Sequence, residues 1–252
     1  MDILILAEAE AFSIGQCIVG LNQTSLAKYQ GQETGSNRLT IISRFEGAHL
    51  QHIAAPGPPR DSRWAFHKLL RPGLDPALIV SVHLRSKLSA SENDQYARVR
   101  RLSEEIVRLE TTEKTTRTVV VGDFNMDPFD VGMQACDGMH ALLSKQEIAV
   151  HRGARIHDTR SYRMFFNPAW RLHGEQSDGP PGSYYFRGDG VLVQYWHLFD
   201  QVLVRPALVD GLSVSGVRIL DAVAGGSLLD SSGRPDRIRF SDHLPLLFHL
   251  RI

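Results

Sequence analysis

The fold of this sequence is constrained most by a succession of short apolar runs, each of the length typical of a buried β-strand. Helical segments interrupt these runs, and the alternation predicts a layered α/β sandwich rather than an all-β fold. The predicted strands are Ile3 to Leu6, Leu39 to Ser43, Trp64 to Leu70, Leu78 to Leu84, Thr118 to Val121, residues 183–187, 191–196 and 199–205, and Leu244 to Leu250.

The strongest predicted helix covers residues 91–110. Ser91, followed three residues later by Asp94, resembles an N-terminal cap. An apolar stripe at helical spacing runs along it, formed by Val99, Leu102, Ile106 and Leu109. A shorter helical spacing begins at Ile14, before a polar loop at 30–37, and residues 145–182 are irregular enough to predict a long functional loop. With no repeat or linker, we expect residues 1–252 to form a single domain.

Charge and cysteine content limit the partners and the compartment. Lys plus Arg and Asp plus Glu number 28 each, so the net charge is zero and a nucleic acid would need a local basic patch. The two cysteines form no CxxC pair, which excludes a zinc site of that kind and fits a reducing compartment. No signal sequence or membrane span is evident, so we expect a cytoplasmic protein.

The segment VVVGDFNMDP carries the clearest chemical signal. In an extended chain Asp123 and Asn125 point to one side and Phe124 to the other, with Gly122 allowing a turn at the strand end. A carboxylate and an amide presented together could orient a water molecule and bind a phosphate oxygen. The alternative interpretation is an ordinary Asp/Asn turn.

Four other segments offer acids or imidazoles at strand ends. Asp242 and His243 precede the last strand, Asp200 opens another, His83 ends a buried one, and Glu8 follows the first. A carboxylate such as Asp200 could orient His243, and a strand-end Glu suits Mg²⁺. Glu10 competes with Glu8, since both lie on the same alternating face, and each signal alone also fits a structural role.

The order of these segments resembles the endonuclease/exonuclease/phosphatase (DNase I-like) superfamily. A strand-end Glu is followed by VHL, then GDFN, then a strand-opening Asp, then SDH before the last strand, across nearly the whole chain. The resemblance implies a four-layer α/β/β/α sandwich and a Mg²⁺-dependent phosphoric ester hydrolase, with Mn²⁺ as a substitute metal.

The resemblance also implies roles for individual residues. Glu8 is similar to the main metal ligand of the family and Asp242 to a second metal-site carboxylate. Asp123 is similar to the residue that orients the attacking water, with Asn125 on the phosphate. His243, paired with Asp200, resembles the imidazole at the scissile phosphate, and His83 resembles the histidine of the DNase I, sphingomyelinase and deadenylase branches.

The sequence departs from the family pattern at its start. The family begins with a strand ending in Asn, upstream of the strand that carries the metal-binding Glu, whereas this sequence starts at the second of those strands. We therefore expect a sandwich without the first family strand, and Ala7 stands where the family usually has Gln.

The substrate is predicted less sharply. Arginines alternate with aromatic residues over 150–171, which suits phosphate binding and base stacking or, equally, a packed surface segment. The candidate substrate-binding residues are Arg155, Arg160, Asn167 and Trp170. A nuclease or nucleotide phosphodiesterase acting on DNA or RNA is the leading hypothesis. The alternatives are a phospholipid or inositol-phosphate phosphatase and a catalytically impaired binding protein of the same fold.

Overall fold

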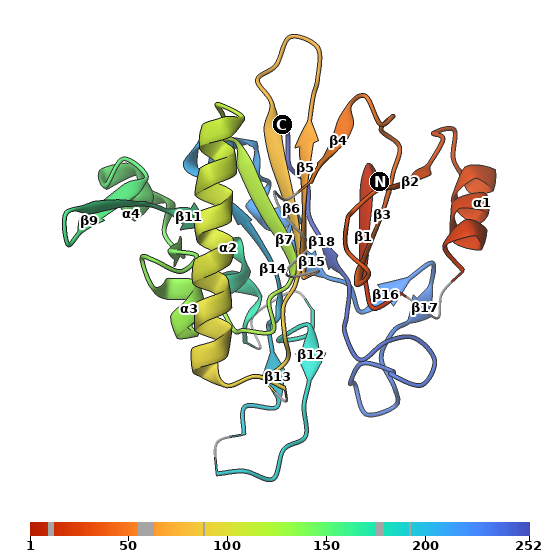
Figure 1. The fold of residues 1–252 in the computed structure, drawn as a ribbon. Helices are drawn as coiled ribbons and strands as arrows, with labels where there is room; N and C mark the ends of the chain where they lie inside the picture. Colours follow the sequence, from red (N-terminus) through yellow and green to blue (C-terminus); the bar gives the residue numbers. More distant parts are fainter. Residues whose placement is uncertain (10–12, 55–62, 88, 175–178, 192) are drawn as a thin grey trace.

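A seven-stranded sheet lies at the centre of the computed structural model, which describes residues 1–9, 13–54, 63–87, 89–174, 179–191 and 193–252 (Figure 1). In spatial order its strands are β4 (Leu50–Ile53), β5 (Trp64–Leu69), β6 (Ala77–His83), β7 (Thr118–Asp123), β14 (Asp200–Val204), β11 (Phe165–Phe166) and β8 (Ala141–Leu142). β6 and β7 are parallel, while β5 and β14 run antiparallel beside them.

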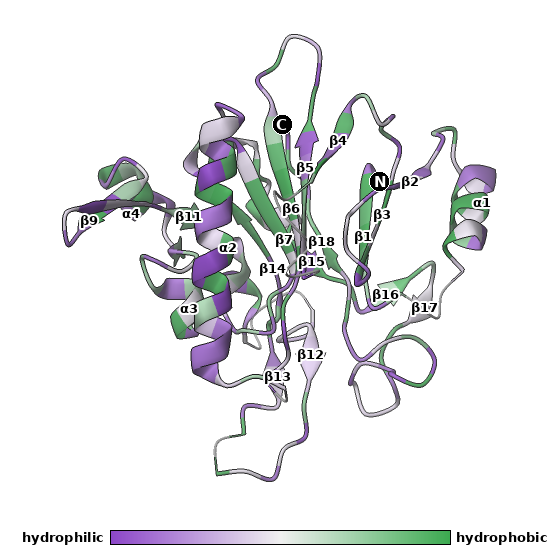
Figure 2. Cartoon of the chain, viewed as in Figure 1, coloured by the Kyte–Doolittle hydropathy of each residue, from purple (hydrophilic) through white to green (hydrophobic). Residues whose placement is uncertain are grey.

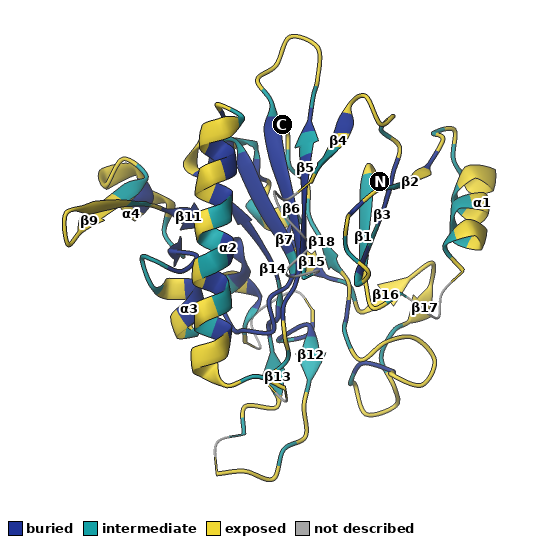
Figure 3. Ribbon diagram, in the orientation of Figure 1, coloured by how far each residue is buried: buried dark blue, intermediate teal, exposed yellow. Residues whose placement is uncertain are grey.

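Helix α2 (Glu92–Thr112) connects β6 to β7 and covers one face of this sheet (Figure 1). The predicted cap is present: Ser91 Oγ accepts the Asp94 N–H, and the Asp94 carboxylate accepts the Ser91 N–H. Its predicted stripe faces the sheet and its polar side is exposed (Figures 2 and 3). This crossover brings the carboxyl ends of β6 and β7 to one end of the sheet.

A second, three-stranded sheet packs on the other face, with β3 (Leu39–Ser43) between β1 (Ile3–Ala7) and β2 (Gln30–Gln32). Within the part of the chain that the structure describes, β1 pairs only with β3. Helix α1 (Ile14–Thr24) lies outside this sheet (Figure 1). The succession of helix α2, the two sheets and helix α1 is consistent with the predicted four-layer sandwich.

The alternation of side chains along β7 separates the two cores. Val119 and Val121 face the core between the sheets, where Ile3 and Ile5 of β1 also pack. Val120 faces the α2 side with Leu102. Because both faces of β7 are covered, the strand is a continuous β-branched run, as the sequence predicted.

The region 145–182 is more regular than expected. It contains α4 (Lys145–Val150), the hairpin of β9 (Ala154–His157) and β10 (Arg160–Arg163), strand β11 and the 3₁₀ helix η1 (Pro168–Leu172). The polar segment 30–37, predicted as a loop, begins with strand β2, which is an edge strand and so carries no buried apolar run.

The last third of the chain contains shorter strands than predicted. β12 (Tyr184–Tyr185) pairs with β13 (Trp196–His197), and β18 (Leu246–Leu247) pairs with β15 (Arg218–Ile219). Pro245 can donate no ladder hydrogen bond, so β18 starts later than the apolar run. The remaining elements are α3 (Val131–Gln134), η2 (Pro206–Gly211), η3 (Val214–Gly216), β16 (Ala222–Val223) and β17 (Gly226–Ser227). A search of the described ranges finds no helix with the length and apolarity needed to cross a membrane.

Candidate active site

The candidate site lies where β7 ends and the antiparallel strand β14 begins. Asp123 and Asp200 are directly paired residues of these strands, and His83 at the end of β6 pairs with Asp123 from the other side. Sheet register alone thus aligns three of the predicted residues. Gly122 makes this possible, because a Cβ at its position would lie 2.1 Å from the Val82 carbonyl oxygen, and its φ is +138°.

Asp123 and Asn125 contact each other, as their alternation predicted. The Asn125 backbone N–H donates to Asp123 Oδ1 over 2.7 Å, and the Asn125 side-chain amide donates to Asp123 Oδ2 and to the Leu84 carbonyl. Asn125 has a φ of 50°, a left-handed conformation that Asn tolerates well. Phe124 between them is fully buried in the core.

The carboxyl of Asp123 has an unusual acidity. Its residue is only 5% exposed, so burial, followed by the adjacent charge of Asp200, raises the pKa of Asp123 to about 7. The positive charge of His243 and the Asn125 N–H act in the opposite direction. A divalent cation beside Asp123 would favour its ionised form in the same way.

His243 and Asp200 form the predicted pair. His243 Nδ1 lies 2.8 Å from Asp200 Oδ2. Burial disfavours the imidazolium, but the charge and hydrogen bond of Asp200, together with Asp123 and Asp242, outweigh it and raise the pKa of His243 to about 10. Its ring is therefore held as a cation, which suits contact with a phosphate oxygen.

Glu8 and His83 approach this group from the other sheet and from β6. His83 Nε2 lies 3.6 Å from Glu8 Oε1 and 3.7 Å from Asp123 Oδ2. Burial lowers the pKa of His83, which favours a neutral ring. Glu8 is exposed and its backbone φ is 51°. Its Oε1 also lies 3.7 Å from Arg38 Nη1. Glu10, its competitor in the sequence, lies outside the described residues.

The donor set suits a hard divalent cation. Asp123, Asp200 and His243 converge, with one oxygen or nitrogen atom of each within 4.8 Å of the others, and the two carboxylates rather than the protonated His243 ring are the groups able to bind the cation. Glu8 adds a carboxylate near the same place, and the pKa of Asp123 is raised first by burial and then by the negative charge of Asp200, both of which a bound cation would offset. Asp242 is exposed and is not part of that cluster of described residues, although its charge acts on His243.

The arginines predicted to bind substrate lie elsewhere, which corrects that prediction. Arg155 and Arg160 belong to the exposed β9–β10 hairpin. The hairpin ends at Arg163, whose backbone carbonyl accepts a hydrogen bond from Arg205. Arg205 follows the last residue of β14, at the opposite end of that strand from Asp200. The alternation of arginines with aromatic residues in the sequence therefore did not predict which residues lie at the candidate site.

The other two predicted substrate contacts separate as well. Asn167 is 0% exposed, and its side chain caps η1 through the Ala169 N–H and donates to Gln201, so its role is structural. Trp170 is half-buried and its ring lies 6.2 Å from that of Phe129, in the loop that follows GDFN. Asn167 thus contacts the neighbour of Asp200 in the chain, and the Trp170 ring lies near the loop that follows GDFN.

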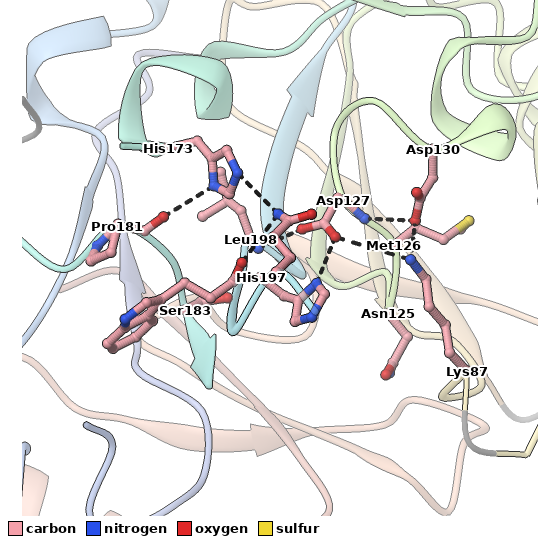
Figure 4. Close-up of polar contacts among 12 residues, drawn as sticks. Lys87, Asn125, Met126, Asp127, Asp130, His173, Pro181, Ser183, His197 and Leu198 are labelled. Carbon is pink, nitrogen blue, oxygen red and sulfur yellow. Dashed lines mark hydrogen bonds and ion pairs between the residues drawn. The ribbon is translucent and has the colours of Figure 1, made fainter. Parts of the chain in front are cut away.

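A buried ionic cluster beside the site was not predicted. Figure 4 shows Asp127 between His197 and Lys87. Asp127 accepts from His197 Nδ1 over 2.7 Å and from the Leu198 N–H over 2.8 Å, while Lys87 pairs with Asp130 at 2.6 Å. Asp127 and His197 are 70 positions apart in the sequence, so their pairing could not be read from a local motif. The one signal in the sequence is that each stands within a few residues of a predicted site residue, Asn125 or Asp200.

Comparisons with known proteins agree with this geometry. Residues 2–243 match the Endonuclease/Exonuclease/phosphatase family. None of the curated proteins searched matches the sequence significantly.

Solved structures share the fold at low identity. A 3′-5′ exonuclease (NExo) from Neisseria meningitidis is 18% identical with a TM-score of 0.54, over 100% of this chain and 90% of that one. The human Nocturnin catalytic domain is 16% identical with a TM-score of 0.53, over 99% and 80%. An AP endonuclease from Archaeoglobus fulgidus is 14% identical with a TM-score of 0.53, over 100% and 89%. With a family match across nearly its whole length and a DNase I-like α/β fold, this chain belongs to the endonuclease/exonuclease/phosphatase family of phosphoric ester hydrolases.

Proposed function

We propose that this chain is a divalent-metal-dependent phosphodiesterase that cleaves nucleic acid or nucleotides. The observation that carries the proposal is the convergence of two carboxylates and a cationic imidazole: one oxygen or nitrogen atom each of Asp123, Asp200 and His243 lies within 4.8 Å of the others. The similar solved structures support a nucleic-acid substrate, since they include a 3′-5′ exonuclease, an AP endonuclease and a 3′ phosphatase bound to a product DNA hairpin.

Glu8 and Asp123 are the carboxylates proposed to hold the cation, because both border the same nitrogen of His83. Asp242 stays a proposed second carboxylate of the metal site. Mg²⁺, or Mn²⁺ in its place, would supply neutralisation of the charge that develops on the phosphoryl and leaving oxygens.

The remaining steps belong to the side chains. Asp123, held by the two N–H groups of Asn125, accepts a hydrogen bond from the attacking water and orients it in line with the leaving oxygen. His243 donates from Nε2 to a non-bridging phosphate oxygen, since Asp200 occupies Nδ1. His83 lies beside Asp123, and its neutral ring is placed to donate an N–H hydrogen bond to the leaving oxygen.

The test is hydrolysis of single-stranded DNA, duplex DNA, RNA and inositol phosphates with Mg²⁺, with Mn²⁺ and with EDTA. Asp123→Asn and His243→Ala are each expected to lower turnover by about 10²–10⁴-fold. Asp210→Asn, an exposed acid in η2 at the far end of β14, is the matched control and should retain activity. Wild-type turnover in folded Asp123→Asn protein, or full activity in EDTA, would overturn the proposal.

A further inference from the structure

A cavity of about 520 Å³ lies beside His243, outside the group of acids and imidazoles described above. Its lining includes Tyr184, Tyr185 and Phe186 together with Arg234, Arg237 and Asp242. Its volume is within the range of sites that hold a small organic ligand. Three aromatic rings and three guanidinium groups line it beside three carboxylates, and the rings and guanidinium groups suit a ligand with both a planar ring and a phosphate.

The cavity is continuous with the candidate active site through Tyr184. The backbone of Tyr184 forms a β-bridge with His243, and the Leu244 N–H donates to the Ser183 carbonyl. The Tyr184 ring lies 4.7 Å from the His243 ring and stacks on Phe199 at 5.3 Å. The Tyr184 side chain therefore separates a group bound in the cavity from the His243 imidazole, which is proposed to contact the scissile phosphate.

Flat surfaces for stacking are present in the cavity. The Arg234 guanidinium lies 4.4 Å from the centre of the Tyr185 ring, which supports its plane. Phe186 is 39% exposed, so part of its ring is open to a ligand. Bases stack on aromatic rings and on guanidinium planes alike, largely regardless of base identity.

Two arginine side chains of the cavity are available to bind phosphate groups. Arg187 and Arg237, which both line the cavity, form no ion pair or side-chain hydrogen bond with any residue that the structure describes. Two of the three acids that line the cavity are engaged in their own turns: Asp230 accepts from Ser232 and the Arg234 N–H, and Asp236 accepts from the Ile238 and Arg239 N–H groups. The third, Asp242, lies on the His243 side, where its charge acts on that imidazole.

We infer that this cavity binds an unpaired nucleoside next to the scissile phosphate, with the base against Phe186 and Arg234 and the adjoining phosphate near Arg237. This inference rests on the proposed phosphodiesterase function and narrows its substrate to single-stranded nucleic acid. A paired base cannot present its face to the cavity, because its neighbours in the duplex already stack on it. An inositol phosphate has no planar ring to use the aromatic side.

The experiment compares two substrates of equal phosphate content: a single-stranded DNA oligonucleotide and a base-free tetrahydrofuran-phosphate chain of the same length. Phe186→Ala and Arg234→Ala should each lower kcat/KM for DNA by about 5- to 150-fold, the range of one base stacked on an aromatic ring. Their kcat/KM for the base-free chain should change by less than about twofold. Arg237→Ala should weaken the binding of both substrates. It should also reduce the slope of log KM against log salt concentration by about 0.7.

Two controls keep the result interpretable. Arg108→Ala removes the same charge from the exposed face of α2 and should leave both substrates unaffected. Thermal melting of each variant excludes loss of fold. If wild-type protein cleaves DNA and the Phe186 and Arg234 variants do so equally well, the cavity inference is overturned and the phosphodiesterase proposal stands. If wild-type protein cleaves neither chain, the proposed function itself fails.

Discussion

Gly122 shows at the residue scale how a backbone contact dictates a residue type next to the candidate site. A methyl group there would meet the Val82 carbonyl oxygen at 2.1 Å, and the neighbouring strand cannot retreat without disturbing the pairing of His83 with Asp123. Gly122→Ala should lower the free energy of unfolding by about 1–3 kcal/mol. Gly20→Ala is the control, since no atom lies within 4 Å of that position in helix α1, and it should stabilise by about 0.5–1 kcal/mol. Urea denaturation of both proteins measures the difference.

His140 gives a pH dependence that is separate from the candidate site. Burial lowers the pKa of His140 below 6.5, so the folded protein binds fewer protons at this ring than the unfolded chain. The contribution of His140 to the free energy of unfolding should therefore be constant above about pH 7 and fall as the pH drops through 6.5. His140→Asn, which suits the φ of 47°, should flatten the profile of unfolding free energy between pH 7.5 and 5.5. An unchanged profile would show that other groups cause the loss.

At the element scale, Asp127 fixes the segment that delivers Asp200. Asp127 is almost fully buried and holds both His197 and the Leu198 N–H, three and two residues before the start of β14. Asp127→Ala should lower the free energy of unfolding by about 1–3 kcal/mol, because the buried Leu198 N–H loses its acceptor. It should also reduce turnover, since Asp200 positions His243.

Two substitutions of His197 distinguish a structural role of the Asp127–His197 pair from a chemical one. His197→Asn keeps a side-chain donor for Asp127, whereas His197→Ala removes it. We expect the Asn variant to retain most of the stability and turnover that the Ala variant loses. Calorimetric melting and the rate of DNA cleavage give the two readouts. Equal losses in both variants would mean that the imidazole itself, rather than its hydrogen bond, is required.

At the scale of the whole molecule, the sequence predicted the strands with two covered faces and the acids at their ends. β6, β7 and α2 could be predicted because burial imposes apolar runs or a helical stripe on them, and Asp123 and His83 follow directly. The antiparallel pairing of β14 beside β7 could not be derived locally. Arg155 and Arg160 were misplaced for the same reason: local composition does not reveal at which end of the sheet a hairpin is rooted.

The two sheets meet at the candidate metal site, and this makes the whole fold a reporter of binding. Glu8 follows β1 of the smaller sheet, while Asp123 ends β7 of the central one. A cation held by both binds only when the sheets are packed together, so it should stabilise the native state by about 2.7 kcal/mol at a hundred times its Kd. Mg²⁺ should raise the Tm of the wild-type protein and of Asp210→Asn, and should leave that of Glu8→Gln and Asp123→Asn nearly unchanged. Because Tm is read without substrate, this measurement separates loss of the metal from loss of chemistry. An equal Mg²⁺-dependent rise in all four proteins would place the cation elsewhere.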